Sequence, residues 1–262
     1  MQVVTLEPDC AQCVGLCCVA LPFRPSHGFA FAKDAGEPCR NLDSAHGCSI
    51  HAMLRESGMS GCTTYECFGA GQHVTQVVYA GATWRDKADG GSEMFAVFAV
   101  MQRLHEMLVL LDQASALLPG PRLTRLRELV AGHTEGRPEE ILDADLDRLA
   151  ALVGEALREV SRTVRGPGPS YVGNDLVGHD LRDTDLTGAD LRGAVLIAAD
   201  LRDAVLDRTD LLGADLRDTD LAGADLSTAL FLTQPQLNAA RGTSSTVLPA
   251  HLRRPLNWAL AG

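Results

Sequence analysis

The chain of 262 residues contains no run of eighteen apolar residues, no basic segment near its N-terminus and no cysteine after Cys67. The first absence argues against a membrane-spanning helix, and the second argues against a secretory signal. We therefore expect a cytoplasmic protein without membrane contact. Thiols stay reduced in that compartment, so cysteines that cluster there favour metal ligands over disulfides.

Basic side chains are scarce as well. Lys and Arg number 23 against 34 Asp and Glu, which gives a formal net charge of −11. This balance argues against direct nucleic-acid binding, because neutralising phosphates requires a surplus of positive charge. The imbalance is largest in residues 166–233, where 13 acidic and 5 basic side chains leave a charge of −8.

Catalytic groups in a recognisable arrangement are also missing. The sequence shows no paired carboxylates, no Ser-His-Asp order and no phosphate-binding loop. Gly69-x-Gly71 follows Cys67 without a preceding strand, so it is too weak to predict a nucleotide site. His105 and Glu106 lie in a predicted helix, where we expect an ordinary surface pair. The sequence leaves enzymatic activity undecided and favours its absence.

Residues 92–166 are predicted to be helical. Ser92 is a suitable N-cap for a first helix, which Pro119 ends. A short helical segment follows from Leu123 to Ala131, and Pro138 is well placed to open another helix. Apolar residues at helical spacing form two stripes, which we interpret as core: Phe95, Phe98, Met101, Leu104, Leu108 and Leu111 in the first helix, and Leu142, Leu146, Leu149, Val153, Ala156, Val160 and Val164 in the last.

Eleven leucines recur at five-residue intervals from Leu176 to Leu226. This period fits neither a helix nor a strand, and it indicates a solenoid in which each short segment forms one side of a coil. Ala or Thr stands two residues before the leucine in nine repeats, and Asp directly precedes it in nine. The pattern resembles the pentapeptide-repeat family, A-(D/N)-L-x-x, over residues 172–233.

This resemblance implies a right-handed quadrilateral β-helix with four repeats per coil. Leucine and alanine would fill the tube, while the aspartates would face water. A twelfth repeat centred on Phe231 completes three coils, roughly 14 Å long at the usual strand spacing. Thr233 and Gln236 form a capping-box pattern that opens a short helix through Leu237 to Arg241. We expect this helix to cover the end of the tube, with Trp258 packing near the terminus.

The cysteines are concentrated at the other end of the chain. Their order resembles the CxxCxxCC family, described as zinc- or iron-chelating, over residues 10–70, with one extra residue between Cys13 and Cys17. The resemblance implies metal binding and gives no activity. We predict that all eight are metal ligands: Cys10, Cys13, Cys17, Cys18, Cys39, Cys48, Cys62 and Cys67.

Thiolates suit zinc and iron–sulfur clusters alike, so the sequence leaves the metal open. Eight thiols suffice for two four-cysteine sites, or for one cluster with further thiols beside it. Because adjacent side chains diverge, Cys17 and Cys18 can serve different sites. His46 and His51 lie close to Cys48 and could replace a thiolate, although a surface or supporting position is the commoner one.

These features predict a multidomain α+β protein with four regions. They are a loop-rich cysteine module (1–91), a helical region (92–166), the pentapeptide β-helix (172–233) and a C-terminal cap with a helical lid (234–262). The function that fits best is a metal-binding scaffold that contacts a protein partner through the solenoid faces. The partner and the oligomeric state stay open.

Two alternative functions remain. One is an iron–sulfur redox or protein-modifying enzyme, since flagellin lysine methylases carry a similar cysteine cluster. The other is a DNA-mimic regulator of DNA gyrase, which the acidic charge fits and the length of three coils does not. For the scaffold, Val177 and Ile197 should stack beside Val195 as an apolar patch. Arg182 and Arg202 should stack on the next face.

Overall fold

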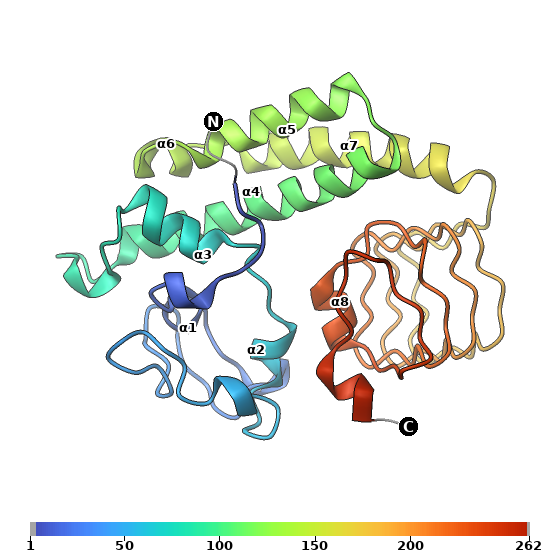
Figure 1. Ribbon diagram of the computed structural model, residues 1–262, viewed down its shortest axis with the longest axis horizontal. Helices are drawn as coiled ribbons and strands as arrows, with labels where there is room; N and C mark the ends of the chain where they lie inside the picture. The colour runs from blue at the N-terminus through green and yellow to red at the C-terminus, as the bar shows by residue number, and fades with distance from the viewer. Residues whose placement is uncertain (1–3, 261–262) are drawn as a thin grey trace. The chain divides into compact units, whose positions relative to one another are not determined.

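The computed structural model describes residues 4–260, and the chain divides into two compact units, Met1–Ala156 and Leu157–Gly262 (Figure 1). We call them unit 1 and unit 2. The boundary falls within helix α7 (Leu146–Arg165). Unit 1 contains the cysteine-rich segment and the long helix that follows it. Unit 2 contains the leucine repeats and the C-terminal segment.

Helix α4 (Ser92–Leu117) is the central element of unit 1, and α5 lies beside it in Figure 1. Four helices contact α4: α1 (Leu16–Ala20), α3 (Ala70–His73), α5 (Pro121–Thr134) and α6 (Pro138–Leu142). The shorter elements of unit 1 are α2 (Ser60–Thr64), the 3-10 turns η1 (Cys10–Gln12), η2 (Pro25–His27), η3 (His51–Met53) and η5 (Trp84–Asp86), and the π-helical segment η4 (Val74–Val78).

The cysteine-rich segment and the helices share one hydrophobic core. Leu16, Ala70 and Val74 from the first segment are buried in the same cluster as Phe98 and Met101 of α4. By length and composition α4 could cross a membrane, and 56% of its most apolar window is buried within the protein. Its buried stripe identifies it as the core helix of unit 1.

Two helix boundaries differ from the prediction. The N-cap of α4 is Gly91 and not Ser92, because the Asp89 carboxylate accepts the N–H groups of Gly91 and Glu93 at 3.0 and 2.9 Å. The helix predicted from Pro138 is two helices, α6 and α7. Asp145 accepts the Arg148 N–H at 3.0 Å and starts α7 separately.

The expected surface position of His105 is wrong. Its side chain is fully buried, and its Nδ1 lies 2.7 Å from the Phe68 carbonyl oxygen. Its ring packs edge to face against that of His73, with the two ring centroids 5.1 Å apart. Burial lowers the pKa of His105 to about 4, so the ring is neutral at pH 7 and Nδ1–H donates. His105 stands four residues after Met101, on the apolar stripe of the helix, which explains its burial.

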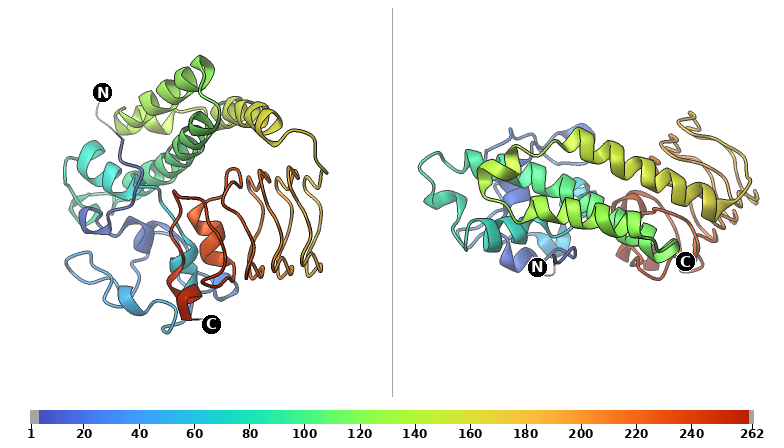
Figure 2. Two further views of the ribbon diagram at one scale, coloured as in Figure 1. Left: turned by 45° about the vertical axis from the view of Figure 1, so that its right-hand side comes forward. Right: turned by 90° about the horizontal axis from the view of Figure 1, so that it is seen from above.

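Unit 2 consists of stacked coils of twenty residues (Figure 2). Parallel β-bridges join residues twenty positions apart, for example Asp175 with Val195 and Asp180 with Asp200. Four such bridges per coil give four sides of five residues each, as the resemblance to the pentapeptide-repeat family implies. The bridges from Ser170 to Leu230 span three coils, and within residues 4–260 they are isolated bridges without continuous strands.

The interior of the coils is filled as predicted. The repeat leucines from Leu186 to Leu226 and the alanines from Ala189 to Ala224 that stand two residues before a leucine are buried in one cluster. Three threonines occupy alanine positions. Thr184 is half-buried, and the two buried ones satisfy their hydroxyls inside the tube: Thr209 Oγ1 donates to the Leu186 carbonyl and Thr219 Oγ1 to the Leu196 carbonyl, both at 2.7 Å. A buried hydroxyl is tolerated because it is hydrogen-bonded.

Helix α8 (Gln234–Ala239) covers the C-terminal end of the coils, which confirms the predicted lid (Figure 2). The capping box of Thr233 and Gln236 is present. Gln236 Nε2 also donates to the carbonyl oxygens of Leu211 and Ala214, at 2.8 and 2.9 Å. Trp258 is buried against the lid, with its Nε1 3.1 Å from the Ala240 carbonyl oxygen.

The aspartates before the leucines are turn residues, which corrects the expectation that they simply face water. All nine accept the backbone N–H two residues further on, at 2.9 to 3.3 Å. Aspartate commonly stabilises turns in this way. Two of the nine, Asp190 and Asp210, are 4% and 0% exposed.

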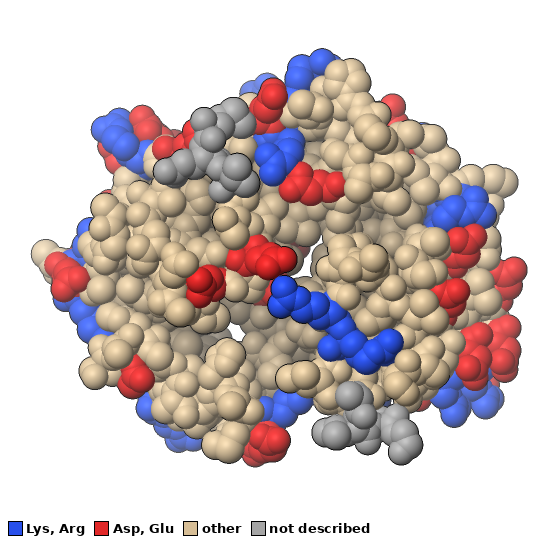
Figure 3. Space-filling model, viewed as in Figure 1, with Lys and Arg blue, Asp and Glu red and all other residues tan. Residues whose placement is uncertain are grey.

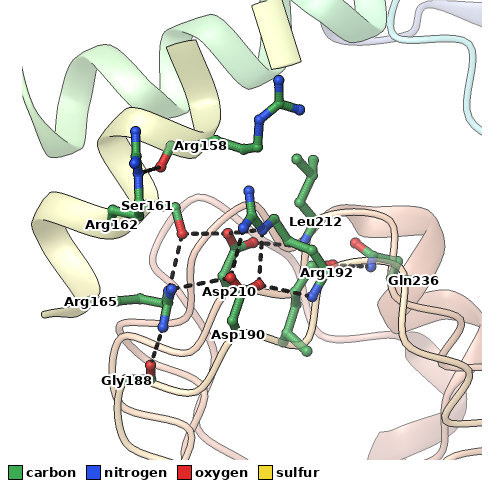
Figure 4. Close-up of polar contacts among 11 residues, drawn as sticks. Arg158, Ser161, Arg162, Arg165, Gly188, Asp190, Arg192, Asp210, Leu212 and Gln236 are labelled. Carbon is green, nitrogen blue, oxygen red and sulfur yellow. Dashed lines mark hydrogen bonds and ion pairs between the residues drawn. The ribbon is translucent and has the colours of Figure 1, made fainter. Parts of the chain in front are cut away.

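Asp190 and Asp210 are buried because the end of α7 docks on them within unit 2 (Figure 4). Ser161 Oγ donates to Asp210 Oδ2 at 2.5 Å, and Arg165 Nη2 donates to Asp190 Oδ2 at 3.1 Å. Arg192 pairs with both carboxylates, at 2.7 and 3.3 Å. The buried Arg165 and the half-buried Arg192 thus balance two buried aspartates, as a desolvated charge network requires.

We predict that Asp210→Ala lowers the free energy of unfolding of unit 2 by about 3 kcal/mol, because it removes the buried acceptor of Ser161 and leaves Arg165 and Arg192 with the single carboxylate of Asp190. Asp225→Ala is the matched control. Asp225 occupies the same repeat position but is exposed and accepts only the Ser227 N–H, so its loss should be about 1 kcal/mol. Urea unfolding followed by Trp258 fluorescence, in a Trp84→Phe background, measures both. Equal losses would contradict a special role for the network.

Candidate metal centre

The structure brings the eight predicted ligands together in unit 1. Seven thiols line one cavity of about 830 Å³: Cys10, Cys13, Cys17, Cys18, Cys48, Cys62 and Cys67. The eighth, Cys39, is buried, and its N–H donates to the Cys18 carbonyl at 2.9 Å. All eight are free thiols. Residues up to 57 positions apart in the sequence therefore converge on one place.

Short local elements carry these cysteines. η1 begins at Cys10, α1 carries Cys17 and Cys18, and α2 carries Cys62. Gly15, the N-cap of α1, has φ +70°, and a Cβ there would lie 2.6 Å from Leu42 Cδ1. This left-handed conformation favours glycine, and the close approach of Leu42 leaves no room for a side chain.

Backbone N–H groups point at four of the thiols. Cys13 accepts from Gly15 and Leu16, and these bonds lower its pKa against the effect of burial. The other three accept in the same way: Cys39 from Asn41 at 3.4 Å, Cys48 from Ile50, and Cys67 from Gly69 and Gly71. Hydrogen bonds of this kind favour the anionic form of an acceptor, which is the form that binds metal.

Without a bound cation, burial keeps most of the thiols protonated. It raises the pKa of six of them, including Cys13 to about 11 and Cys62 to about 12. The pKa of Cys17 is raised chiefly by its hydrogen bond with Cys18 and then by burial. The pKa of Cys18 is lowered, because Cys17 hydrogen-bonds to it and Lys33 lies nearby. A thiophilic cation would displace their protons on binding.

Two residues beside the thiols were missed by sequence reasoning. The Tyr65 hydroxyl is buried with no hydrogen-bond partner among the described residues, close to Cys17, Cys67 and Cys13. Lys33 is 7% exposed, and its Nζ donates to the carbonyls of Val19 and Asp34 at 3.1 and 3.2 Å. Signals for both exist: Tyr65 stands two residues before Cys67, and Lys33 is one of only two lysines.

The two candidate histidines also line the cavity. His46 Nε2 is buried without a hydrogen-bond partner in the described part of the chain, and burial lowers its pKa. His51 is exposed. Among residues 4–260, no three His, Cys, Asp or Glu side chains are arranged to hold a metal ion. The thiols are spread over the cavity wall. In type and number the residues fit a thiophilic metal, and in spacing they do not converge on one ion.

Comparison with known proteins identifies the family. The model of pentapeptide repeats matches residues 173–203 and 194–231. A Bacillus subtilis (strain 168) protein named "Uncharacterized protein YybG" is 52% identical over 264 residues, which cover 97% of this chain and 95% of that protein. The chain is a pentapeptide-repeat protein of the YybG family. The resemblance of residues 10–70 to the CxxCxxCC family stays a prediction, because the family match lies in unit 2.

Solved structures similar to this chain are also pentapeptide repeat proteins. One, from the Arabidopsis thaliana thylakoid lumen, is 30% identical with a TM-score of 0.28, over 34% of this chain and 60% of that one. Another, Rfr23 from the cyanobacterium Cyanothece 51142, is 28% identical with a TM-score of 0.23, over 30% and 56%. This YybG-family chain thus spans less than two thirds of either solved protein.

Gly71 gives a test of the thiol arrangement. A Cβ at Gly71 would lie 2.6 Å from Cys13 Sγ, whereas one at Gly132 in α5 would meet nothing within 4 Å. We predict that Gly71→Ala lowers the free energy of unfolding of unit 1 by about 1–3 kcal/mol. Gly132→Ala should raise it by up to about 1 kcal/mol, because alanine is the better helix former. Thermal unfolding followed by helical circular dichroism compares the two. A stabilised Gly71→Ala variant would contradict the close contact.

Proposed function

We propose that this protein is a metal-stabilised scaffold for protein–protein contact in the cytosol. Unit 1 binds zinc or iron through its eight thiols, and unit 2 presents the faces of its coils to a partner. The observation that carries the metal half is the convergence of seven thiols on one cavity with the eighth buried beside them. Eight reduced thiols gathered in one part of a chain are typical of metal ligands.

The architecture of the cysteine segment supports this assignment. Its loops enclose a small cluster in which Phe23, Cys39 and Met59 are the buried members. A core of this size supplies little folding free energy by itself. Metal binding supplies such energy in small domains, since the preformed site is absent from the unfolded chain.

The spread of the thiols favours an iron–sulfur cluster over mononuclear zinc. Four sulfurs around one zinc ion each lie about 2.3 Å from it and must converge on a point. An iron–sulfur cluster is bound by thiolates on its outside, so its ligands lie further apart. A cluster would add redox chemistry to the structural role. The chain's own residues would hold it, exclude water and donate N–H groups to its sulfurs.

For the interaction half, one face of the coils carries an apolar patch. Val177 is 49% exposed, and the N–H of Gly178 donates to the Ile197 carbonyl at 2.9 Å, so Val177 and Ile197 lie on neighbouring coils of one face. Val195 lies two residues before Ile197 and is half-buried. Apolar groups of this kind among charged ones are typical of protein contact surfaces.

The next face carries alternating charges, which weakens the DNA-mimic alternative. Arg182 lies 2.7 Å from Asp180 and 3.5 Å from Asp200 of the neighbouring coil, and Arg202 repeats the arrangement with Asp200 and Asp220. This is the predicted stack of Arg182 and Arg202. Figure 3 shows acidic and basic groups side by side over the coils. A mimic of the DNA backbone would need an unbroken row of negative charge.

Metal removal tests the metal half. A chelator should shift the thermal transition of unit 1 to lower temperature and leave that of unit 2 unchanged, because a ligand stabilises only the part that binds it. The shift should include the signal of α4, which shares the core with the cysteine segment. Elemental analysis of protein purified without oxygen identifies Zn or Fe. Two unchanged transitions, or protein free of both elements, would overturn the assignment.

A photo-crosslinking amino acid at Val177 tests the interaction half. We expect it to capture a defined protein in cells of the source organism, and Ile197→Asp should abolish the capture because it places a charge in an apolar contact. A crosslinker at Ser227 is the matched control, since Ser227 is exposed and follows its leucine as Val177 does. Identical products at both positions, or none at Val177, would argue against the face.

A further inference from the structure

We propose that the thiol-lined cavity of unit 1 also binds an uncharged, mainly apolar organic molecule, whose hydroxyl or carbonyl group pairs with Tyr65 and His46. This ligand goes beyond the proposed metal binding and does not depend on it. The cavity measures about 830 Å³, whereas four sulfurs around a zinc ion each lie about 2.3 Å from it. A metal site therefore fills only part of the space, and organic ligands commonly occupy cavities of about 300–1,000 Å³.

Two hydrophobic clusters of unit 1 supply the walls of this cavity. Tyr65 and Cys67 line it and pack against the core cluster that contains Phe98 of α4. Phe23 and Leu54 line it from the second cluster, which the loops of the cysteine segment enclose. Because residues of both clusters line the space, a mainly apolar molecule in it would bury surface from both.

Most of the lining is apolar, and part of it is aromatic. A free cysteine behaves as a small hydrophobic side chain with a weak S–H donor, and seven cysteines line the cavity. The rings of Phe23 and Phe29 are stacked, with their centroids 4.2 Å apart and their planes inclined by 7°. Phe29 also lines the cavity and is only half-buried, so its ring can pack against a further aromatic group. The lining therefore favours an aromatic ligand.

Charge narrows the class of ligand. Among residues 4–260, no Lys or Arg lines the cavity, whereas Glu66 does. Lys33 Nζ lies 4.6 Å from the centroid of the Phe23 ring, but it donates to three backbone carbonyls, which uses all of its hydrogens. A phosphate or carboxylate would thus be buried without a counter-charge, which is costly. An uncharged molecule avoids this cost.

Two buried polar atoms need a partner that the described part of the chain does not supply. They are the Tyr65 hydroxyl and His46 Nε2, and both residues line the cavity. Buried polar groups in proteins are nearly always hydrogen-bonded, so these atoms call for a bound group. A ligand hydroxyl or carbonyl can pair with them, because a phenol both donates and accepts and a neutral imidazole nitrogen does one or the other.

Packing places these two residues at the same cluster. His46 has a positive φ of 66°, in a turn that the Asp43 carboxylate closes by accepting two backbone N–H groups at 2.8 Å each. The His46 ring packs edge to face against that of Trp84, with centroids 6.1 Å apart. Trp84 and Tyr65 pack against one hydrophobic cluster. The polar end of the ligand therefore lies toward this cluster, and its aromatic end lies toward Phe23.

Binding of 2-naphthol and naphthalene, which differ by one hydroxyl, tests the assignment. Both are measured by equilibrium dialysis against the full chain purified without oxygen, and the metal content of the same sample is determined. We expect saturable binding of one molecule per chain. Tyr65→Phe should weaken the binding of 2-naphthol about fivefold and leave that of naphthalene unchanged, because only 2-naphthol can pair with the hydroxyl. His46→Asn should act in the same way, since asparagine tolerates a positive φ.

A bulky side chain in the lining gives a second measurement. Leu54→Trp should abolish the binding of both molecules, because it fills the cavity. Leu129→Trp is the matched control: Leu129 is 45% exposed on α5, outside the lining, and its replacement should leave both affinities unchanged. Circular dichroism checks that each variant is folded. The comparison of the two molecules in Tyr65→Phe decides the matter even where Leu54→Trp fails to fold.

The outcomes separate this ligand from the metal. Absence of saturable binding by the wild-type protein, equal effects of Tyr65→Phe on the two molecules, or full binding by folded Leu54→Trp would overturn the inference and leave metal binding intact. Protein that binds 2-naphthol but contains neither zinc nor iron would overturn the proposed function and leave the ligand site standing.

Discussion

Each side of a coil in unit 2 ends in a turn, and a backbone N–H in that turn needs a hydrogen-bond acceptor. The geometry of the coil depends on the group that accepts this hydrogen bond. The aspartate before each leucine meets it nine times. In four repeats, an arginine two residues after the aspartate also forms an ion pair with the same carboxylate. These arginines are Arg182, Arg192, Arg202 and Arg217. The acidity of this region is therefore a property of its turns, and needs no anionic mimicry to explain it.

Unit 1, in contrast, is held together by contacts between residues that are far apart in the sequence. Its cysteines stand on short turns and helices that have no repeat, and they meet only because loops far apart in sequence close on one another. His105 shows how closely the long helix is involved: it fixes the carbonyl of Phe68, the residue directly after Cys67. The core helix α4 thus supports the wall of the thiol cavity, which explains why the cysteine segment and the helices form one unit.

The sequence predicts unit 2 well because its structure is local and periodic. The interior leucines and the capping box of Thr233 and Gln236 follow from residues within a few positions of one another, and the four sides of the coil follow from the resemblance to the pentapeptide-repeat family. The burial of Asp190 and Asp210 does not, because it comes from Ser161 and Arg165, outside the repeat. The burial of His105 was predictable from its place on the apolar stripe of the helix. Its charged neighbour Glu106 instead suggested a surface position.

The sequence also predicts the ligand candidates of unit 1, but not how they meet, because the cysteines lie on loops and short helices that close over long stretches of chain. Closing the loop from Cys17 to Cys67 alone means ordering about 50 residues. No local pattern encodes such a closure, so the cavity that the thiols line follows only from the packing of these loops and helices in two hydrophobic clusters.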